Sequence, residues 1–261
     1  MTGLRYVYAV CRPLGAPLQA DLTGIAGDPP RLLTHHGLIA VVSHVPERDF
    51  SEEPLRRHLE DPDWLAATTR AHQQVVDALT AVTTPLPLGL ASVFRDDSGV
   101  RVMMEEREDH FRRTLERLTG RVEWGVKVYA EPEPESAGAE DTWQRAERFA
   151  ARLHSTLRAR AEDARLHPPQ GFAPSADDAG ADAGQSVLGA AYLVPRAQSE
   201  EFVEIVDRTK GEEPGIHVEL TGPWAAYSFV EQDEDSGERT DDTAGEESGG
   251  LRNSRGPGVV S

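Results

Sequence analysis

The amino-acid sequence predicts an α+β protein made of two two-layer α/β domains, followed by a disordered acidic tail. Two observations carry this prediction. Segments with the two-residue alternation of strands, such as residues 4–10 and 122–129, are separated by segments with helical spacing, such as residues 62–82. The apolar pattern ends at Val230, and residues 231–261 contain nine acidic and three basic residues, which is typical of a solvated tail.

The first domain is predicted over residues 1–130, with helices on one face of a sheet. A long loop is expected at 11–30. Its strands are expected at 4–10, 31–33, 38–43, 85–94 and 122–129, and its helices at 62–82 and 105–119. Asp61 and Pro62 predict the helix start. An aspartate side chain accepts hydrogen bonds from the free N–H groups of a first turn, and proline at the first helical position has no N–H group that would need a partner. Asp96–Gly99 predicts a turn, and Gly120 predicts the end of the second helix.

The second domain is predicted over residues 142–230. Its expected elements are a helix at 142–165, a strand at 187–194, a helix at 200–210 and strands at 217–221 and 224–230. Gly222-Pro223 should bend the chain between the last two strands. This order resembles a ferredoxin-like domain. An acidic linker is expected at 131–141 and a flexible insert at about 167–185.

Composition limits the classes of partner. With 45 acidic and 27 basic residues among 261, the net charge is −18, which argues against nucleic acid or an anionic membrane as main partner. No window approaches the roughly 20 apolar residues of a membrane span, and the N-terminus lacks the pattern of a secretory signal. A single cysteine, Cys11, allows neither an internal disulfide nor a CxxC metal site. These features predict a cytoplasmic protein.

The candidate reactive side chains have structural explanations. Cys11 ends a strand with no base beside it in sequence. His35 and His36 should point to opposite faces at a strand turn, so with His44 they predict a turn rather than a metal site. His72 lies on the apolar stripe of its helix and is expected in the core.

The remaining polar motifs do not predict catalysis. The acids at 105–109 stand at a helix N-terminus, where the helix dipole favours them, and Asp96–Gly99 lacks the spaced ligands of a calcium loop. Ser92 lies within an expected strand, and no P-loop, GxGxxG or GxSxG motif occurs. The sequence therefore predicts no catalytic, cofactor-binding or metal-binding residue, no small-molecule substrate and no enzyme.

Five aromatic residues have two interpretations. They are Trp124, Tyr192, Trp224, Tyr227 and Phe229. Aromatic side chains at strand positions are usually part of the core. Alternatively, some stay exposed and form a docking patch, because aromatic residues are enriched at the centres of protein interfaces.

Several blocks together resemble the gas vesicle GvpF/GvpL family. The residues that carry the resemblance are Tyr6–Val10, Pro87–Phe94, Val122–Tyr129, Leu188–Val194 and Thr221–Val230. They stand in the family's order and cover roughly residues 4–230. The resemblance implies two α/β domains, the second ferredoxin-like, and no cofactor or reaction. It also implies an accessory protein of gas vesicle assembly that binds the hydrophobic shell protein and other accessory proteins, located at the gas vesicle.

The chain departs from the family pattern at three positions. The central block usually reads PLRFGTVF, whereas Gly89 replaces the arginine and Ala91 the glycine; Gly189 replaces a common asparagine. The expected fold does not depend on these three positions. Contacts that the family's arginine, glycine and asparagine make there are not expected in this chain. The alternative function is a small-ligand sensor or enzyme on paired ferredoxin-like modules, since such folds host many activities.

Overall fold

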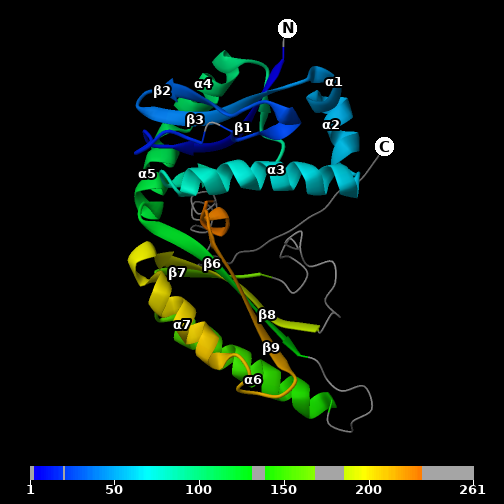
Figure 1. The fold of residues 1–261 in the computed structure, drawn as a ribbon, viewed down its shortest axis with the longest axis vertical. Helices are drawn as coiled ribbons and strands as arrows, with labels where there is room; N and C mark the ends of the chain where they lie inside the picture. The colour runs from blue at the N-terminus through cyan, green and yellow to red at the C-terminus, as the bar shows by residue number, and fades with distance from the viewer. Residues whose placement is uncertain (1–2, 20, 131–138, 168–184, 231–261) are drawn as a thin grey trace, which may run out of the picture. The chain divides into compact units, whose positions relative to one another are not determined.

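The structure, a computed structural model, contains two antiparallel sheets with helices packed on them, which confirms the predicted α+β class (Figure 1). The residues it describes are 3–19, 21–130, 139–167 and 185–230. The predicted linker, insert and tail lie wholly or largely outside these ranges. Among the described residues, no helix combines the length and the apolar composition that crossing a membrane would require.

The first half builds a sheet with strand order β2-β3-β1-β4, and β5 pairs with another part of β1. Its elements are β1 (Leu4–Cys11), β2 (Arg31–His35), β3 (Leu38–Val45), α1 (Glu47–Phe50), α2 (Glu52–Leu59), α3 (Pro62–Thr80), β4 (Pro85–Pro87), β5 (Val93–Phe94), α4 (Asp97–Glu106) and α5 (Glu108–Leu118). The sequence did not predict α1 and α2, and the strand expected at 85–94 is interrupted.

Two local predictions are confirmed. The Asp61 carboxylate accepts hydrogen bonds from the backbone N–H groups of Asp63 and Trp64, and Pro62 is the first residue of α3. The hairpin between β2 and β3 turns at His36 and Gly37. Their φ angles of 46° and 76° are both positive, as a two-residue hairpin turn requires.

Helices cover both faces of the first sheet, whereas the sequence predicted one face. A register shift between Val7 and Ala9 places Tyr6 and Tyr8 toward α3, and Val7 and Val10 toward α4 and α5. Without this shift, strict alternation along β1 would place Val10 on the same face as the two tyrosines. Because β1 is apolar on both sides, each face needs a helical cover.

The segment after β5 also differs from its prediction. Asp96 is not part of a turn but the N-cap of α4, since its carboxylate accepts from the N–H groups of Ser98 and Gly99, both at 2.9 Å. The helix expected at 105–119 is confirmed as α5, whereas α4 was not predicted; the two helices meet at Arg107. Gly120 follows α5 with φ of 76°, as expected for a residue that ends a helix.

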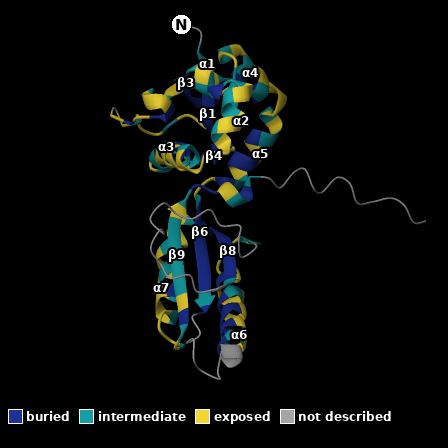
Figure 2. Ribbon diagram, turned by 90° about the vertical axis from the view of Figure 1, so that its right-hand side faces the viewer, coloured by how far each residue is buried: buried dark blue, intermediate teal, exposed yellow. Residues whose placement is uncertain are grey.

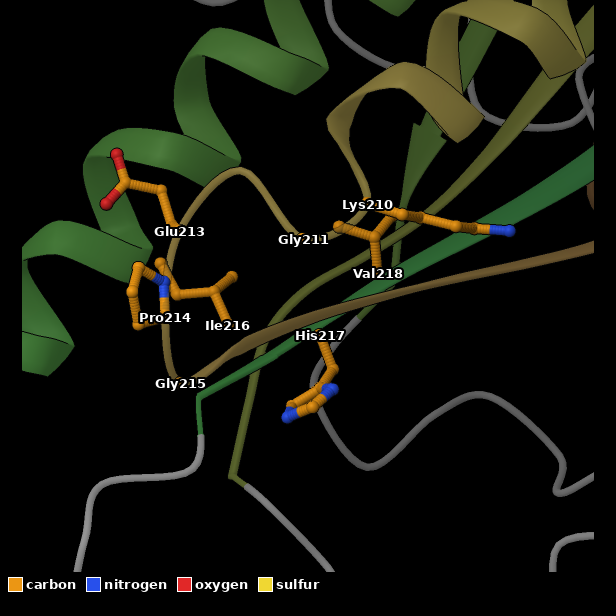
Figure 3. A pocket seen from close by; sticks show the side chains of 8 residues that line it. All are labelled: Lys210, Gly211, Glu213, Pro214, Gly215, Ile216, His217 and Val218. Atoms are coloured by element: carbon orange, nitrogen blue, oxygen red, sulfur yellow. The ribbon is translucent and has the colours of Figure 1, made fainter.

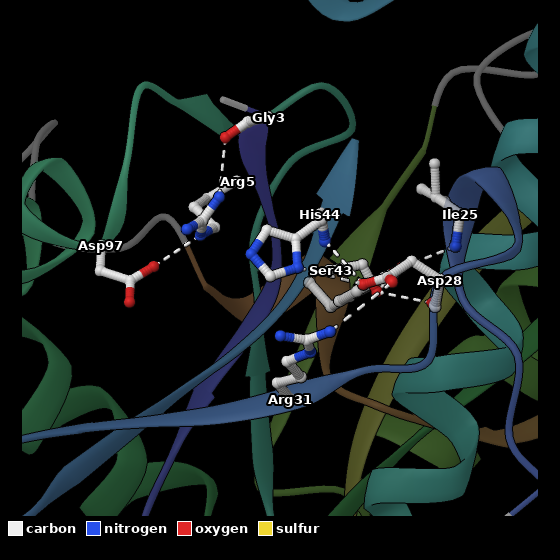
Figure 4. A network of polar contacts seen from close by, with 9 residues as sticks. Gly3, Arg5, Ile25, Asp28, Arg31, Ser43, His44 and Asp97 are labelled. Atoms are coloured by element: carbon white, nitrogen blue, oxygen red, sulfur yellow. Dashed lines mark hydrogen bonds and ion pairs between the residues drawn. The ribbon is translucent and has the colours of Figure 1, made fainter. Parts of the chain in front are cut away.

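Hydrogen bonds fix the predicted loop at 11–30 to the first sheet (Figure 4). The Tyr8 hydroxyl donates to Ser43 Oγ at 3.0 Å and accepts from the Ile25 N–H at 2.7 Å. The Asp28 carboxylate accepts from the backbone N–H of His44 at 2.9 Å. A Cβ at Gly24 would lie 2.4 Å from the Tyr8 hydroxyl, so this position requires glycine. His44 thus belongs to a structural network.

The second half forms a ferredoxin-like arrangement, as predicted. Its elements are β6 (Arg121–Ala130), α6 (Ala139–Arg158), β7 (Asp163–Leu166), β8 (Gln185–Pro195), α7 (Ser199–Thr209) and β9 (Ile216–Trp224). The sheet order is β7-β8-β6-β9, and α6 and α7 pack on one face. Figure 2 shows β6 and β8 buried at the centre and β9 at the side.

Three sequence predictions for this half are corrected. Residues 122–129 were expected in the first sheet, but β6 pairs with β8 and β9. The helix expected at 142–165 ends at Arg158, and residues 163–166 form the short strand β7, which was not predicted. The two expected last strands are one, β9, which continues through a cis Gly222-Pro223 bond. A 3-10 turn at Tyr227–Phe229 replaces the aromatic strand expected at 224–230.

Candidate functional site

Residues 225–230, termed the C-terminal segment, pack against side chains from both halves of the described chain. Ala225 belongs to the core beneath α3, and Phe229 packs with Leu118 of α5 and Leu193 of β8. The Arg117 guanidinium donates a hydrogen bond to the Phe229 carbonyl. The segment therefore connects the first sheet's helices with the helix-free face of the second sheet.

A buried carboxylate holds this segment. Glu123 of β6 is 5% exposed, and its two oxygens accept from Ser228, from the backbone N–H at 2.8 Å and from Oγ at 2.7 Å. Burial raises the pKa of Glu123 to about 7, against the lowering effect of the two Ser228 hydrogen bonds. No local pattern indicated this pair, because Glu123 occupies the alternating polar side of its strand.

Ser228 and His167 do not form a nucleophile and base pair with Glu123. Ser228 Oγ lies 2.7 Å from the carboxylate and 3.4 Å from His167 Nε2, so its proton goes to the stronger and nearer acceptor. In a catalytic triad the carboxylate orients the histidine, whereas here it binds the serine. The arrangement anchors a backbone segment.

A second group of titratable side chains lies beside Tyr227. The Tyr6 hydroxyl hydrogen-bonds to His72 Nδ1 at 2.9 Å, and the His72 ring lies 6.3 Å from that of Tyr227. Burial lowers the pKa of His72 to about 4, so the imidazole is neutral, and burial raises the pKa of Asp77 on α3 to about 6. As predicted, His72 is a core histidine.

The five candidate aromatic residues fall into two groups. Trp124, Tyr192 and Phe229 are buried, at 8%, 0% and 0% exposure. Trp124 donates from Nε1 to Ser199 Oγ, and the Tyr192 hydroxyl hydrogen-bonds to His154 Nδ1. These three are core residues, as the simpler interpretation expects.

Tyr227 and Trp224 do present surface. Tyr227 is 37% exposed, and Trp224 is half-buried at the end of β9. Burial, followed by the charges of Asp77, Tyr6 and Glu123, raises the pKa of the Tyr227 hydroxyl despite this exposure. The exposed fraction, rather than the pKa, decides whether another protein can reach the ring. A contact between these two residues and a partner stays a prediction.

The other candidate residues have structural partners. Cys11 is fully buried, and burial raises the pKa of its thiol to about 12, so it is not a reactive thiolate. His35 and His36 do not point apart, because the positive φ of His36 lets the two rings stack at 4.0 Å. Ser92 Oγ donates to the Gly89 carbonyl.

The predicted acidic run at 105–109 spans the break between α4 and α5. The hydrogen bond with His36 Nδ1 at 2.7 Å, followed by the one from Arg112 Nε at 2.8 Å, lowers the pKa of Glu108. Within the described part of the chain, no three histidine, cysteine, aspartate or glutamate side chains are grouped closely enough to hold a metal ion.

A shallow hollow of about 420 Å³ lies where the turn after α7 leads into β9 (Figure 3). Pro214, Ile216 and Val218 supply apolar walls, and Lys210, Glu213 and His217 supply polar ones. None of the five candidate aromatic residues lines it.

Comparisons with known proteins identify what the chain is similar to. The family model described as gas vesicle synthesis protein GvpL/GvpF matches residues 4–141 and 134–231. Gas vesicle protein L of Streptomyces sp. (strain CB03234) is 50% identical over 253 residues, which cover 87% of this chain and 92% of that relative. Gas vesicle protein F of the same strain is 27% identical over 249 residues, which cover 87% and 99%.

Two crystal structures share the fold. Gas vesicle protein GvpF of Microcystis aeruginosa superposes with a TM-score of 0.64 at 18% identity, covering 89% of this chain and 100% of that one. GvpF of Anabaena sp. PCC7120 gives a TM-score of 0.64 at 17% identity, covering 88% and 99%. At such identities the similarity concerns the fold alone.

Proposed function

Because the chain belongs to the gas vesicle synthesis protein GvpL/GvpF family, we propose that it assists gas vesicle assembly by binding the hydrophobic shell protein and other accessory proteins. The observation that carries this proposal is the 50% identity with a gas vesicle protein L along most of both chains. The lower identity of 27% with gas vesicle protein F of the same strain favours an L-type role.

The proposed mechanism is reversible capping of apolar surface. A shell subunit exposes apolar area until it is built into the shell, and such area promotes aggregation. This chain combines a net charge of −18, which keeps a complex dispersed, with an exposed tyrosine beside a half-buried tryptophan. Tyr227 and Trp224 are the proposed contact residues, and the C-terminal segment positions them.

The proposed role requires no catalysis. The Ser228 hydroxyl is bonded to Glu123, the Cys11 thiol is buried and protonated, and His72 is neutral within a core. Each of these groups has a structural partner or environment that explains it. The proposal places the protein at the gas vesicle, as the names of its relatives suggest.

Gene replacement in a vesicle-forming host tests this assembly role. We expect deletion to reduce or abolish vesicles seen by electron microscopy, and the intact gene to restore them. Tyr227→Ala should restore fewer vesicles, whereas Leu59→Ala, at an equally exposed apolar residue of α2, should restore them fully. Normal vesicles in the deletion strain, with no related gene present, would contradict the proposal.

A further inference from the structure

The sheet edges of this protein are unequally protected. Edge strands β2, β4 and β7 have five, three and four residues, whereas β9 has nine. Figure 2 shows β9 at the side of the second sheet, next to β6. No strand of the described ranges pairs with its outer edge. Every second residue of such a strand directs its N–H and C=O groups away from the sheet.

The usual devices that protect an edge are missing from most of β9. Natural edges carry lysine, proline or a bulge, or are kept short. Residues 216–221 contain neither lysine nor proline, and the irregularity at Gly222-Pro223 lies only at the end of the strand. The one acidic side chain, Glu219, is compensated, since it accepts from the Tyr129 hydroxyl at 3.1 Å and lies 3.9 Å from Lys127 Nζ.

The hollow at the start of β9 extends this edge into a larger surface. Pro214, Ile216 and Val218 line its apolar side, and three of its lining residues are the first three residues of β9 (Figure 3). Strand addition gains affinity from backbone hydrogen bonds and selectivity from pockets that receive alternate side chains. The edge of β9 offers such backbone groups, and the hollow beside its first residues is the candidate receiver for one side chain.

The net charge of the chain indicates which kind of segment could pair with β9. Two copies of this chain, each carrying −18, repel one another, and an acidic strand would meet the same repulsion. An apolar extended segment without net negative charge would satisfy the open backbone groups and fill the hollow. We propose that β9 binds such a segment by β-strand addition and that, resting on the function proposed above, the segment belongs to the shell protein.

Amide hydrogen exchange tests the inference directly. The full-length protein is compared alone and with the purified shell protein of the same gas vesicle cluster, kept in solution by a mild detergent. We expect exchange of alternate β9 amides between Ile216 and Thr221 to slow by about tenfold or more in the complex. The amides of β7, at the opposite edge, should not change.

A matched pair of variants supplies a second test. Thr221→Lys introduces an edge charge on β9, and Leu166→Lys introduces the same charge at the exposed end of β7, where Leu166 is 64% exposed. We expect Thr221→Lys to weaken shell protein binding by about tenfold and Leu166→Lys to leave it unchanged, with both variants folded by circular dichroism.

The outcomes separate this inference from the function on which it rests. Shell protein binding without β9 protection, and with Thr221→Lys binding normally, would overturn strand addition and leave the assembly function standing. No binding by the wild-type protein would overturn both. Protection of β9 in the protein alone, rising with its concentration, would show that a second copy is the occupant and overturn the assignment to the shell protein.

Discussion

Glu123 and Ser228, which are 105 residues apart, are joined by two hydrogen bonds of 2.7 and 2.8 Å that attach the C-terminal segment to β6, one of the two inner strands of the second sheet. The same segment places Ala225 in the core beneath α3. The buried Glu123 carboxylate therefore holds Ser228, the residue next to Tyr227, whose ring is proposed to contact a partner. The protonation state of Glu123 should be visible in the stability of the whole protein.

Glu123→Gln should remove a pH dependence of stability. The folded-state pKa of about 7 is above the ordinary value of 4.5, so the folded protein binds this proton more tightly than the unfolded chain does. Stability from this group is present below pH 4.5 and is lost as pH rises to 7, by up to roughly 3 kcal/mol. Because glutamine does not titrate, the unfolding free energy of the variant minus that of the wild type should increase as pH rises over that range. A constant difference from pH 4.5 to 8 would contradict the assignment.

His72 should contribute the opposite dependence. Burial lowers its pKa from 6.5 to about 4, so the unfolded chain binds the proton more tightly. Its contribution to stability is therefore lost as pH falls from 6.5 toward 4. His72→Gln, which has no such proton to gain, should reduce the acid sensitivity of the melting temperature. The variant should also be less stable than the wild type at pH 8, because it lacks the hydrogen bond between the Tyr6 hydroxyl and His72 Nδ1. Equal acid sensitivity in the two proteins would show that His72 titrates normally.

Ala91→Gly should stabilise the protein. Ala91 has φ of 67°, a left-handed conformation that costs an alanine about 1–2 kcal/mol, and the related family block carries glycine there. Because glycine loses more backbone entropy on folding, the net gain should be about 0.5–1 kcal/mol, measured by urea denaturation. Ala66→Gly, on the exposed face of α3, is the control and should destabilise by about as much. A loss of stability in Ala91→Gly would contradict the strain argument.

Phe229→Ala and Tyr227→Ala should have different effects. Phe229 is fully buried with Leu118 and Leu193, so its truncation should cost about 3–5 kcal/mol of stability. Tyr227 is 37% exposed, and its truncation should cost less stability but weaken partner binding. Denaturation and a binding assay on the same samples measure both effects. Normal binding by a folded Tyr227→Ala variant would move the contact surface elsewhere.

Local features of the fold were predictable because their signals are contained in a few neighbouring residues. Asp61-Pro62 at the start of α3 and the turn at His36-Gly37 follow from capping and backbone chemistry alone. The alternation of β6 identifies a strand but carries no information about which sheet it joins, and its partners in β8 and β9 lie far along the chain. β7 is too short for its alternation to be distinctive.

The candidate site was predictable only in part. Tyr227 was one of five aromatic residues expected either in the core or in a docking patch, and the expected aromatic strand around it is a 3-10 turn in the structure. Glu123 lies at one of the alternating polar positions of β6, which are ordinarily exposed to solvent. The C-terminal segment, however, packs over this side chain and buries it. Such burial depends on tertiary packing between residues 105 positions apart, which no local pattern records.

Co-elution with the shell protein tests the central proposal most directly. The purified protein is mixed with the small hydrophobic shell protein of its gas vesicle cluster, captured by an affinity tag and passed over a size-exclusion column. The proposed function predicts a stoichiometric complex that Tyr227→Ala weakens and Leu59→Ala does not. Separate elution of the two proteins, with the shell protein held soluble by detergent, would contradict it.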